Sequence, residues 1–594
     1  MSKDTVKNLD ALRDAMRKVN VSAVIIPGTD PHQSEYVNPH WKVRDWVSGF
    51  TGSNGTAVVT MDAAGLWTDS RYFLQAAEQL KDSGFDLHKE DIPGEATVTE
   101  WLAEQLDDND VLAVDGRLFS IVRANQLEEF CGANGLRFAT DFAPADSIWT
   151  DRPARPMTKA FVHDVKYAGE DAASKINRVL DAIEGMGADA VFIPALDEIA
   201  WTLNIRGADV ECNPLVVSYL YLSRDVKVLF VDAEKIDEEV MAHLTAVGVE
   251  VKPYDEVQKW LNKEVSANTT VLLDPNKVSD TLARAMECYK VYAVCPVAPI
   301  KAIKNDVQIA GVRNAMERDG AALVRLWMWI EKMAPTGTIT ELDVAQKAIE
   351  YRSASDMYRG ESFGMIAGYK EHGAIVHYSA SPESASTLKA EGLLLVDSGG
   401  QYLDGTTDIT RTMSLGNPTE AEKHDYTLVL KGHLAIGRAV FPVGTRGSQL
   451  DALARIYQWQ EMMTYLHGTG HGVGHFLGVH EGPQNIRLNE NPTTLKVGMI
   501  TSNEPGIYKA GQYGIRTENL VLTVPAGKSE EFGEFLKFES LTLFPYDNNL
   551  IDVAMLSPEE VAQVNAYHAE VRSRLTPYLN AEEQAWLEAR TKAI

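Results

Sequence analysis

The sequence predicts an α/β and α+β protein in which two related α/β domains precede one larger mixed domain. At 594 residues the chain is too long for a single core, because a domain usually takes about 100–200 residues. Its N-terminal half contains one helix–strand pattern twice. A long helical pattern then begins near Asp306, and beyond it capped helices alternate with apolar strands bounded by glycines.

The repeated pattern is an amphipathic helix followed by a buried strand that ends in proline. Residues 10–27, DALRDAMRKVNVSAVIIP, and residues 178–194, RVLDAIEGMGADAVFIP, share this layout. Chance recurrence of a common pattern is the alternative, but the match favours two α/β domains of one kind. The proline-rich stretch WTDRPARPMT at 149–158 is typical of a linker. We therefore expect domains at 1–155, 156–305 and 306–594.

The charge balance excludes some classes of partner. The chain has 84 acidic and 56 basic residues and a formal net charge of −28, which argues against a surface for nucleic acid or anionic membrane. Its first residues lack the apolar segment of a signal peptide, and no apolar run reaches the roughly 18 residues of a membrane span. The four cysteines lack metal-binding spacing, which favours a reduced, cytoplasmic protein.

Three helix starts are predicted in the C-terminal region. Each pairs a hydroxyl residue with a glutamate three positions later, the pattern of a capping box. The pairs are Thr338 with Glu341, Thr419 with Glu422, and Ser557 with Glu560. Pro558 would occupy the first position of the last helix.

Two aspartates lie at the ends of predicted strands. Asp397 ends the apolar stretch 393–396, and Asp408 opens a second strand-like stretch. A hairpin folded about Tyr402 and Leu403 would bring the two carboxylates together, with a bulge because the turn signal at Asp404 lies off that centre. Adjacent carboxylates repel unless a cation or shared proton relieves them. A metal site is therefore one interpretation, and two turn-forming aspartates at strand ends are the other.

Two glutamates lie in similar surroundings. Glu504 ends a strand-like run before a Pro-Gly turn, and Glu518 lies within the next run, on the same face as Arg516. A glutamate in so apolar a stretch is costly to bury without a partner. That partner is either a metal ion or Arg516.

The stretch HGTGHGVGHFLGVH at 467–480 contains four histidines and five glycines. Two aspartates, two glutamates and one histidine form a typical set for a hydrolytic site with two divalent ions. Mostly oxygen ligands favour Mn²⁺ or Co²⁺, with Zn²⁺ as the alternative. Ligand chemistry does not choose among His467, His471 and His475. The absence of a His-Glu-x-x-His helix excludes a zincin site.

Five residues, in their order along the chain, resemble the metal set of the pita-bread metallopeptidases. They are Asp397, Asp408, His471, Glu504 and Glu518. The resemblance is closest to aminopeptidase P in its long, three-domain, cytosolic form, and it covers nearly the whole chain. The motifs that carry it are DPHQSEY, VSGFTGSNGTAVVT, WTDSRYFLQAA, WTDRPARP, LDEIAWTLNIRG, VHYSA, DGTTDITRT, HGTGHGVGHFLGVHEGP, NEPGIY, GIRTENLVL and FESLTLFPYD. The implied fold is two creatinase-like α/β domains followed by a catalytic pita-bread metallopeptidase domain.

The resemblance also implies a role for each site residue. Asp397 would bind one metal ion, His471 and Glu504 the second, and Asp408 and Glu518 would bridge both. The remaining roles concern the substrate site and the neighbouring side chains. His377 and His480 would contact substrate, Glu504 would carry a proton, Arg516 would orient a ligand, and His467, His475, His372, His424 and His433 would lie outside the metal set.

The implied enzyme is a cytoplasmic homodimer that releases the N-terminal residue of peptides whose second residue is proline, with water activated by two ions. Mn²⁺ is the expected metal, and no nucleic acid or membrane partner is expected. A prolidase cuts dipeptides only, and the double N-terminal domain argues against it. A non-catalytic peptide- or histone-binding module, or a metal-free hydrolase of creatinase type, would lack ligands that this sequence retains.

Overall fold

A computed structural model describes residues 2–594 and divides the chain into two compact units. One unit takes Met1–His163 and Glu170–Ala298, and the other takes Asp164–Gly169 and Pro299–Ile594. The first unit contains two sheets, one in the range of each of the first two expected domains, whereas residues 164–169 and 299–305 of the second expected domain belong to the other unit. The domain boundaries at 155 and 305 stay predictions.

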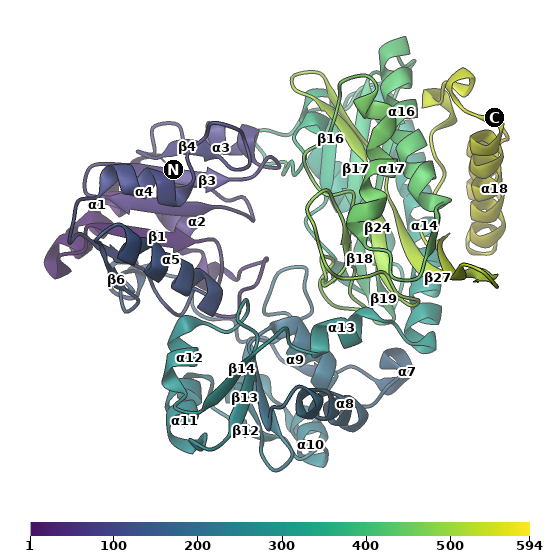
Figure 1. Cartoon of the computed structure of the whole chain (residues 1–594). Helices are drawn as coiled ribbons and strands as arrows, with labels where there is room; N and C mark the ends of the chain where they lie inside the picture. Colours follow the sequence, from purple (N-terminus) through teal and green to yellow (C-terminus); the bar gives the residue numbers. More distant parts are fainter. Residues whose placement is uncertain (1) are drawn as a thin grey trace. The chain divides into compact units, whose positions relative to one another are not determined.

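The first unit contains two six-stranded sheets of identical strand order (Figure 1). In each, the central strand pairs antiparallel with one strand of a hairpin on one side and parallel with one strand on the other, and that strand pairs parallel with an edge strand. The first sheet has the order β4-β3-β2-β1-β5-β6, with β1 Ala23–Pro27, β2 Thr56–Thr60, β3 Ala64–Thr68, β4 Asp86–Lys89, β5 Val111–Ala113 and β6 Arg137–Ala139. The second has the order β12-β11-β10-β8-β13-β14, with β8 Ala190–Ile193, β10 Ser218–Ser223, β11 Lys227–Val231, β12 Glu250–Lys252, β13 Thr270–Leu273 and β14 Tyr289–Tyr292. The predicted repeat is therefore confirmed.

Helices precede the central strands as predicted from the repeated pattern. Helix α1, Ser2–Val19, leads into β1, and α8, Ala172–Gly185, leads into β8. Both central strands are fully buried. The other helices of eight or more residues in this unit are α4 Val98–Gln105, α5 Ile121–Ala133, α9 Leu196–Leu203, α10 Glu238–Ala246 and α11 Val257–Glu264.

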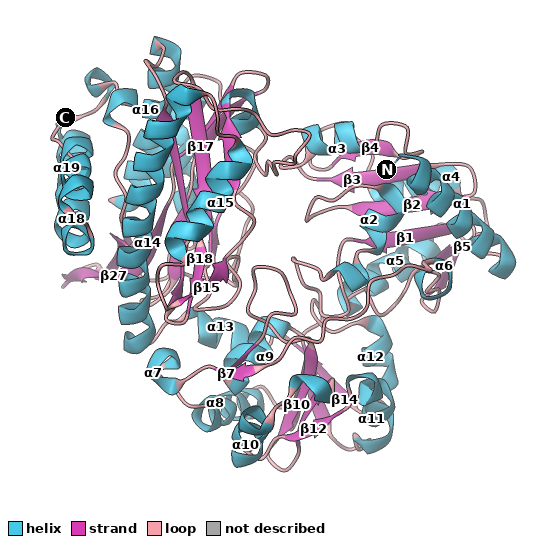
Figure 2. Ribbon diagram, turned by 180° about the vertical axis from the view of Figure 1, so that it is seen from behind, coloured by secondary structure: helices cyan, strands magenta, loops and turns pink. Residues whose placement is uncertain are grey.

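The second unit is a mixed domain of long helices packed on antiparallel strands (Figure 2). Its core includes Trp327 of α14, Leu394 of β17, Val429 of α16 and Phe544. The helices of ten or more residues are α14 Asp306–Met333, α15 Glu341–Arg352, α16 Glu420–Gly437, α17 Gly447–Trp459, α18 Pro558–Leu575 and α19 Ala581–Arg590. The strands that position the site are β16 Ile366–Tyr369, β17 Leu393–Ser398, β18 Gly400–Tyr402, β19 Gly405–Thr406, β20 Ile409–Ser414, β22 Gly470–His471, β23 Asn485–Ile486, β24 Ile500–Asn503, β25 Gly506–Lys509, β26 Tyr513–Arg516, β27 Asn519–Ser529 and β28 Gly533–Ser540.

Two of the three predicted capping boxes are confirmed. Thr419 caps α16 with Glu422, and Ser557 caps α18 with Glu560, with Pro558 at the first helical position. The third prediction is wrong. Helix α15 is capped by Thr340 with Asp343, because the carboxylate of Glu341 is turned into the interior of the domain, where four groups of the segment 369–386 hydrogen-bond to it.

No helix among residues 2–594 combines the length and the apolar character that crossing a membrane requires. The four cysteines carry free thiols.

Candidate metal centre

The two aspartates come from neighbouring positions of one antiparallel pair. Strand β17 pairs with β20 so that Asp397 lies opposite Thr410. Asp408 lies two residues before Thr410, and the period of two makes it a diagonal neighbour of Asp397 on the same face. The expected hairpin is confirmed, but its centre is wrong by one residue. The turn lies at Leu403 and Asp404, and one register runs through both strand pairs without the predicted bulge.

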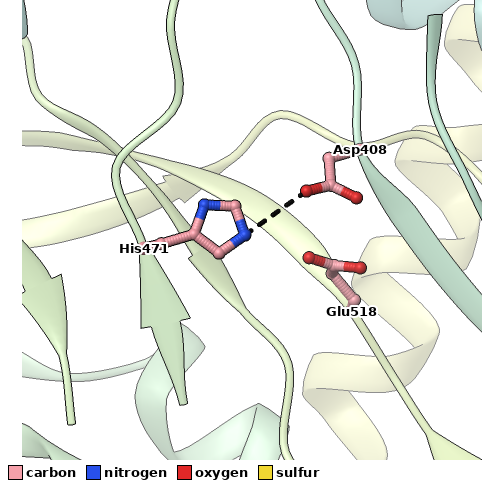
Figure 3. Close-up of side chains that lie close together, drawn as sticks. All are labelled: Asp408, His471 and Glu518. Atoms are coloured by element: carbon pink, nitrogen blue, oxygen red, sulfur yellow. Dashed lines mark ion pairs between the residues drawn. The ribbon is translucent and has the colours of Figure 1, made fainter. Parts of the chain in front are cut away.

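The side chains of three expected ligands lie close together and point toward one another (Figure 3). Asp408, His471 and Glu518 each offer one ligand atom, and these atoms all lie within 4.8 Å of one another. His471 Nε2 is 3.5 Å from Asp408 Oδ2 and also 3.5 Å from Glu504 Oε1. A fourth expected ligand therefore borders the cluster.

The glutamates are held at strand ends. Glu504 follows directly after β24, as predicted, and Ser502 Oγ lies 3.2 Å from its Oε1. Glu518 was expected inside a strand, and this expectation is wrong, since the residue lies between β26 and β27. Its backbone is held by Thr410, because the Glu518 amide donates to the Thr410 carbonyl and Thr410 Oγ1 donates 2.8 Å to Glu518 Oε2.

Glycines explain how His471 reaches the cluster. A Cβ on Gly470 would lie 1.9 Å from the carbonyl oxygen of Ser502, and a Cβ on Gly472 would lie 2.0 Å from that of Glu481. Neither position accommodates a side chain. The His471 amide donates 2.9 Å to Ser502 Oγ, so the strand bearing His471 lies directly against the strand that leads to Glu504.

Arg516 binds the fifth expected ligand. Its Nη2 donates 2.6 Å to Asp397 Oδ2, its Nε donates 3.1 Å to Thr410 Oγ1, and its Nη1 donates 2.8 Å to the hydroxyl of Tyr508. Tyr508 also lies 2.8 Å from His467 Nε2. Arg516 therefore pairs with Asp397 rather than with Glu518, the alternative left open by the sequence.

Burial and mutual repulsion raise the pKa values of the clustered carboxyls. Burial holds the pKa of Asp408 well above its usual range, and the carboxylates of Glu518, Asp397 and Glu504 raise it further. The pKa of Glu518 is raised for the same reasons. Burial raises the pKa of Glu504 to about 7 against the opposing charge of Arg516. Carboxylates so placed ionise together only when cations neutralise them.

The donor set fits two divalent ions. Four carboxylates match the charge of two such ions, and oxygen donors with one imidazole suit hard or borderline metals. Asp397 Oδ1 is buried without a hydrogen-bond partner, while Oδ2 is held by Arg516. A metal ion would supply the partner that this oxygen lacks.

The remaining histidines separate into two groups. His480 lies beside the cluster, because its ring centroid is 4.3 Å from that of His471. His377 is half-buried, and the carbonyl of the preceding residue, Val376, lies 3.5 Å from Arg516 Nη2. The others lie in structural or surface environments. His467 contacts Tyr508, His475 is buried, His433 bonds Asn503 and Tyr546, His372 contacts Glu341, and His424 pairs with Glu461.

Sequence reasoning missed Tyr508, Thr410 and a buried ion cluster at Glu481. The period of two places Thr410 on the face of Asp408, and this signal could have identified it. Glu481 lies 2.9 Å from Lys301 Nζ and 2.8 Å from Lys304 Nζ. No local pattern predicts that contact, because the lysines are far from Glu481 in the sequence.

Family models match almost the entire chain. The model for metallopeptidase family M24 matches residues 310–525, and that for the C-terminal region of the same peptidases matches residues 534–594. The creatinase/prolidase N-terminal domain matches twice, at 8–147 and 151–308. The chain is also 41% identical over 614 residues to aminopeptidase P2 of Arabidopsis thaliana, with 97% of this chain and 86% of the relative covered. This chain belongs to the aminopeptidase P family.

A second aminopeptidase P relative and a solved structure agree over the full length. The probable Xaa-Pro aminopeptidase P of Aspergillus niger is 40% identical, with 100% of this chain and 99% of the relative covered. The crystal structure of X-prolyl aminopeptidase from Caenorhabditis elegans, a cytosolic enzyme with a di-nuclear active site, matches with a TM-score of 0.95 at 35% identity and covers 100% of both chains. The expected fold and a metallo-aminopeptidase of the aminopeptidase P family are thereby confirmed.

A shorter solved structure is similar to this chain in fold. Xaa-Pro dipeptidase from Bacillus anthracis matches with a TM-score of 0.51 at 23% identity, covering 64% of this chain and 99% of that one. This match leaves about a third of the present chain without a counterpart.

Proposed function

We propose that this chain is a metal-dependent Xaa-Pro aminopeptidase that releases the N-terminal residue of peptides whose second residue is proline. The convergence of Asp408, His471 and Glu518, with Glu504 3.5 Å from the imidazole, carries the proposal. The names of two full-length matches, Xaa-Pro aminopeptidase P and X-prolyl aminopeptidase, suggest the substrate class.

Five side chains would hold two divalent ions. Asp397 would bind one ion, His471 and Glu504 the other, and Asp408 and Glu518 would bridge them. Mn²⁺ suits this set, and Co²⁺ and Zn²⁺ are the alternatives. When bound, two such ions lower the pKa of a shared water toward neutrality and so supply the nucleophile.

Glu504 is the proposed proton carrier. Its Oε1 lies 3.5 Å from Nε2 of the proposed ligand His471, which places the carboxylate beside the ions and the water that they would activate. It would take a proton from the attacking water and pass it to the nitrogen of the departing proline. Its backbone amide donates 2.8 Å to the Thr469 carbonyl, which keeps the carboxylate next to the strand that bears His471.

His480 and His377 are the proposed substrate contacts. The ring of His480 stands edge-on to that of His471, with an interplanar angle of 74°, so it borders the proposed second ion. Both histidines would hydrogen-bond the substrate backbone and the oxyanion that develops on its carbonyl. Each such hydrogen-bond donor raises kcat by a factor of roughly 10²–10³.

Proline at the second position explains the need for a dedicated enzyme. Proline lacks a backbone N–H and has a fixed φ, so peptidases that bind an extended backbone reject it. The free N-terminal amine would lie at the metal site, with the carbonyl of the first residue next to Glu504.

We also propose that the enzyme acts in the cytoplasm as a homodimer. An apolar stripe is exposed on one face of α17 and the turn after it. It comprises Leu453, Ile456, Trp459, Met462 and Leu466, with Met462 97% exposed. An exposed apolar patch of this kind is typical of a protein–protein interface.

The decisive experiment compares two peptides. Metal-stripped protein is assayed on Arg-Pro-Pro and on Arg-Pro, with and without added Mn²⁺. Release of arginine from the tripeptide that returns with Mn²⁺, with slow cleavage of the dipeptide, is the expected result. Rapid cleavage of the dipeptide alone would make the protein a prolidase. No cleavage of either with any candidate ion would make it a binding module.

A further inference from the structure

The segment that carries His377 has little regular structure. Between β16 and β17 it forms one short 3-10 turn, η5 Lys370–Ala374, and then runs to residue 388 without a helix or a strand. An irregular segment loses backbone entropy when it is ordered, so its contacts must hold it in place.

One buried carboxylate holds several points of this segment. Glu341 is 0% exposed. Its Oε1 accepts 2.8 Å from the Tyr369 amide and lies 2.8 Å from His372 Nδ1. Its Oε2 accepts 2.7 Å from the Ser386 amide and 2.9 Å from the hydroxyl of Tyr378. The same carboxylate therefore binds the beginning, the middle and the end of the segment.

Backbone contacts reinforce the far end of the segment. The Glu341 amide donates 3.2 Å to the Ser386 carbonyl, and the Leu388 amide donates 2.8 Å to the Ile339 carbonyl. The segment thus returns along the residues that precede α15, and the carboxylate lies inside the closed segment.

The two neighbours of His377 in the chain, Val376 and Tyr378, contact different parts of the domain. On one side, the carbonyl of Val376 lies 3.5 Å from Arg516 Nη2, which also binds Asp397. On the other side, the hydroxyl of Tyr378 binds Glu341. The position of His377 is thus set between the metal centre and the buried carboxylate.

We propose that Glu341 is a positioning residue for the peptidase reaction, holding the segment that presents His377 to the substrate. The inference rests on the proposed function, which places His377 against the substrate. Glu341 itself lies in the interior and would touch neither substrate nor metal.

The chemistry of the four donors requires a carboxylate. Oε1 of Glu341 faces two groups and Oε2 faces three, because His372 Nδ1 also lies 3.0 Å from Oε2, and at both oxygens a backbone amide is one of the groups. A glutamine has the same shape but replaces one acceptor oxygen with an NH₂ donor. That NH₂ would face donors, so Glu341→Gln loosens one half of the segment and leaves the other half bound.

The test is a double-mutant cycle with Glu341→Gln, His377→Ala and the two combined. Asp343→Asn is the matched control, because it removes the exposed carboxylate of the α15 capping box without touching the segment. We expect Glu341→Gln to keep its metal content and its KM and to lose between about tenfold and 10²-fold in kcat. The double variant should be no slower than His377→Ala. Asp343→Asn should keep wild-type kcat.

Each failure has its own signature. Normal kcat in Glu341→Gln, with His377→Ala slow, overturns the inference and leaves the proposed function intact. Normal kcat in His377→Ala removes that histidine from the proposed function. If the kcat losses of the two single variants multiply in the double variant, Glu341 acts by another route and the inference is overturned. Loss of metal from Glu341→Gln overturns it as well. If Glu341→Gln does not fold, Tyr378→Phe removes one contact to the same carboxylate and enters the same cycle.

Discussion

Arg516 donates a hydrogen bond of 2.6 Å to Asp397 and leaves the other oxygen of that carboxylate buried without a partner. Arg516 is itself 1% exposed, so the pair lies in the interior, where charge–charge interactions are strong. One oxygen is oriented by the protein, and the other is the one that would bind a metal ion. This division is typical of metal sites, in which outer contacts orient the ligating groups.

Replacing this guanidinium should weaken the metal centre. Arg516→Lys keeps the positive charge but loses the forked contacts to Asp397, Thr410 and Tyr508. We expect a loss of about 10–100-fold in metal affinity or in activity. Titration of metal-stripped protein with Mn²⁺ measures it. Tyr508→Phe, which removes one hydroxyl contact of Arg516, should show a smaller loss. Wild-type affinity in Arg516→Lys would contradict the orienting role.

Asp408→Asn should abolish turnover and lower the bound metal below two ions. The amide carries no charge, and Asp408 is proposed to bridge both ions. The first unit should stay folded, as measured by circular dichroism. Asp404→Asn is the control, because Asp404 lies in the turn between β18 and β19 and contacts Arg318 rather than the metal centre. Two bound ions and normal activity in Asp408→Asn would refute the site assignment.

The metal-free protein should lose stability as the pH rises from about 4.5 to about 7. Burial raises the pKa of Glu504 from 4.5 to about 7, so in this window the folded state holds a proton that the unfolded state has released. The free energy of unfolding then falls with rising pH, by about 1.4 kcal/mol per pH unit for each such proton. Urea unfolding across this range measures the slope.

Bound metal should reverse this pH dependence. Ions displace the protons from the clustered carboxyls, so metal affinity rises with pH and adds stability toward neutral pH. A metal-free protein whose stability is flat or rises between about pH 4.5 and 7 would show that the carboxyls are already ionised without a cation.

His480→Ala should retain both metal ions and lose about 10²–10³-fold in kcat, because an oxyanion donor would be missing. Metal analysis and steady-state kinetics on Arg-Pro-Pro measure the two effects. His424→Ala is the control on the surface of the same unit, where the imidazole pairs with Glu461. An unchanged kcat/KM in His480→Ala would remove this residue from the mechanism.

Trp459→Glu should convert the proposed homodimer into monomers. A carboxylate in the middle of an apolar interface would be buried without a partner. Light scattering coupled to size exclusion measures the mass. Phe532→Glu changes another exposed apolar side chain, 70% exposed at the tip of the β27–β28 hairpin, and should leave the mass unchanged. A dimer of Trp459→Glu would place the interface elsewhere.

Much of the fold could be predicted from short-range patterns. The helix–strand unit ending in VIIP recurs as VFIP because both central strands are buried and need an apolar run of the same kind. The capping boxes at Thr419 and Ser557 depend only on side chains within one turn. The prediction for Thr338 and Glu341 is wrong because a distant segment binds the Glu341 carboxylate, which no local pattern shows.

The arrangement of the candidate site could be predicted only in part from the sequence. The spacing of Asp397 and Asp408 predicted a hairpin, but the turn lies one residue further along because one register runs through both strand pairs. The role of Arg516 could not be decided either. Arg516 is the last residue of β26 and could have paired with Glu518, two residues later, but the fold places it against Asp397.

The sequence by itself determined the kinds of residue at the site and the family to which the chain belongs, because ligand identity and motif order are properties of the chain. The tertiary structure decided which of these side chains meet. The contacts Arg516–Asp397, Thr410–Glu518 and Glu341–Tyr378 join residues far apart in the chain. Such contacts depend on how strands and helices pack, and packing depends on the whole buried core rather than on any local pattern.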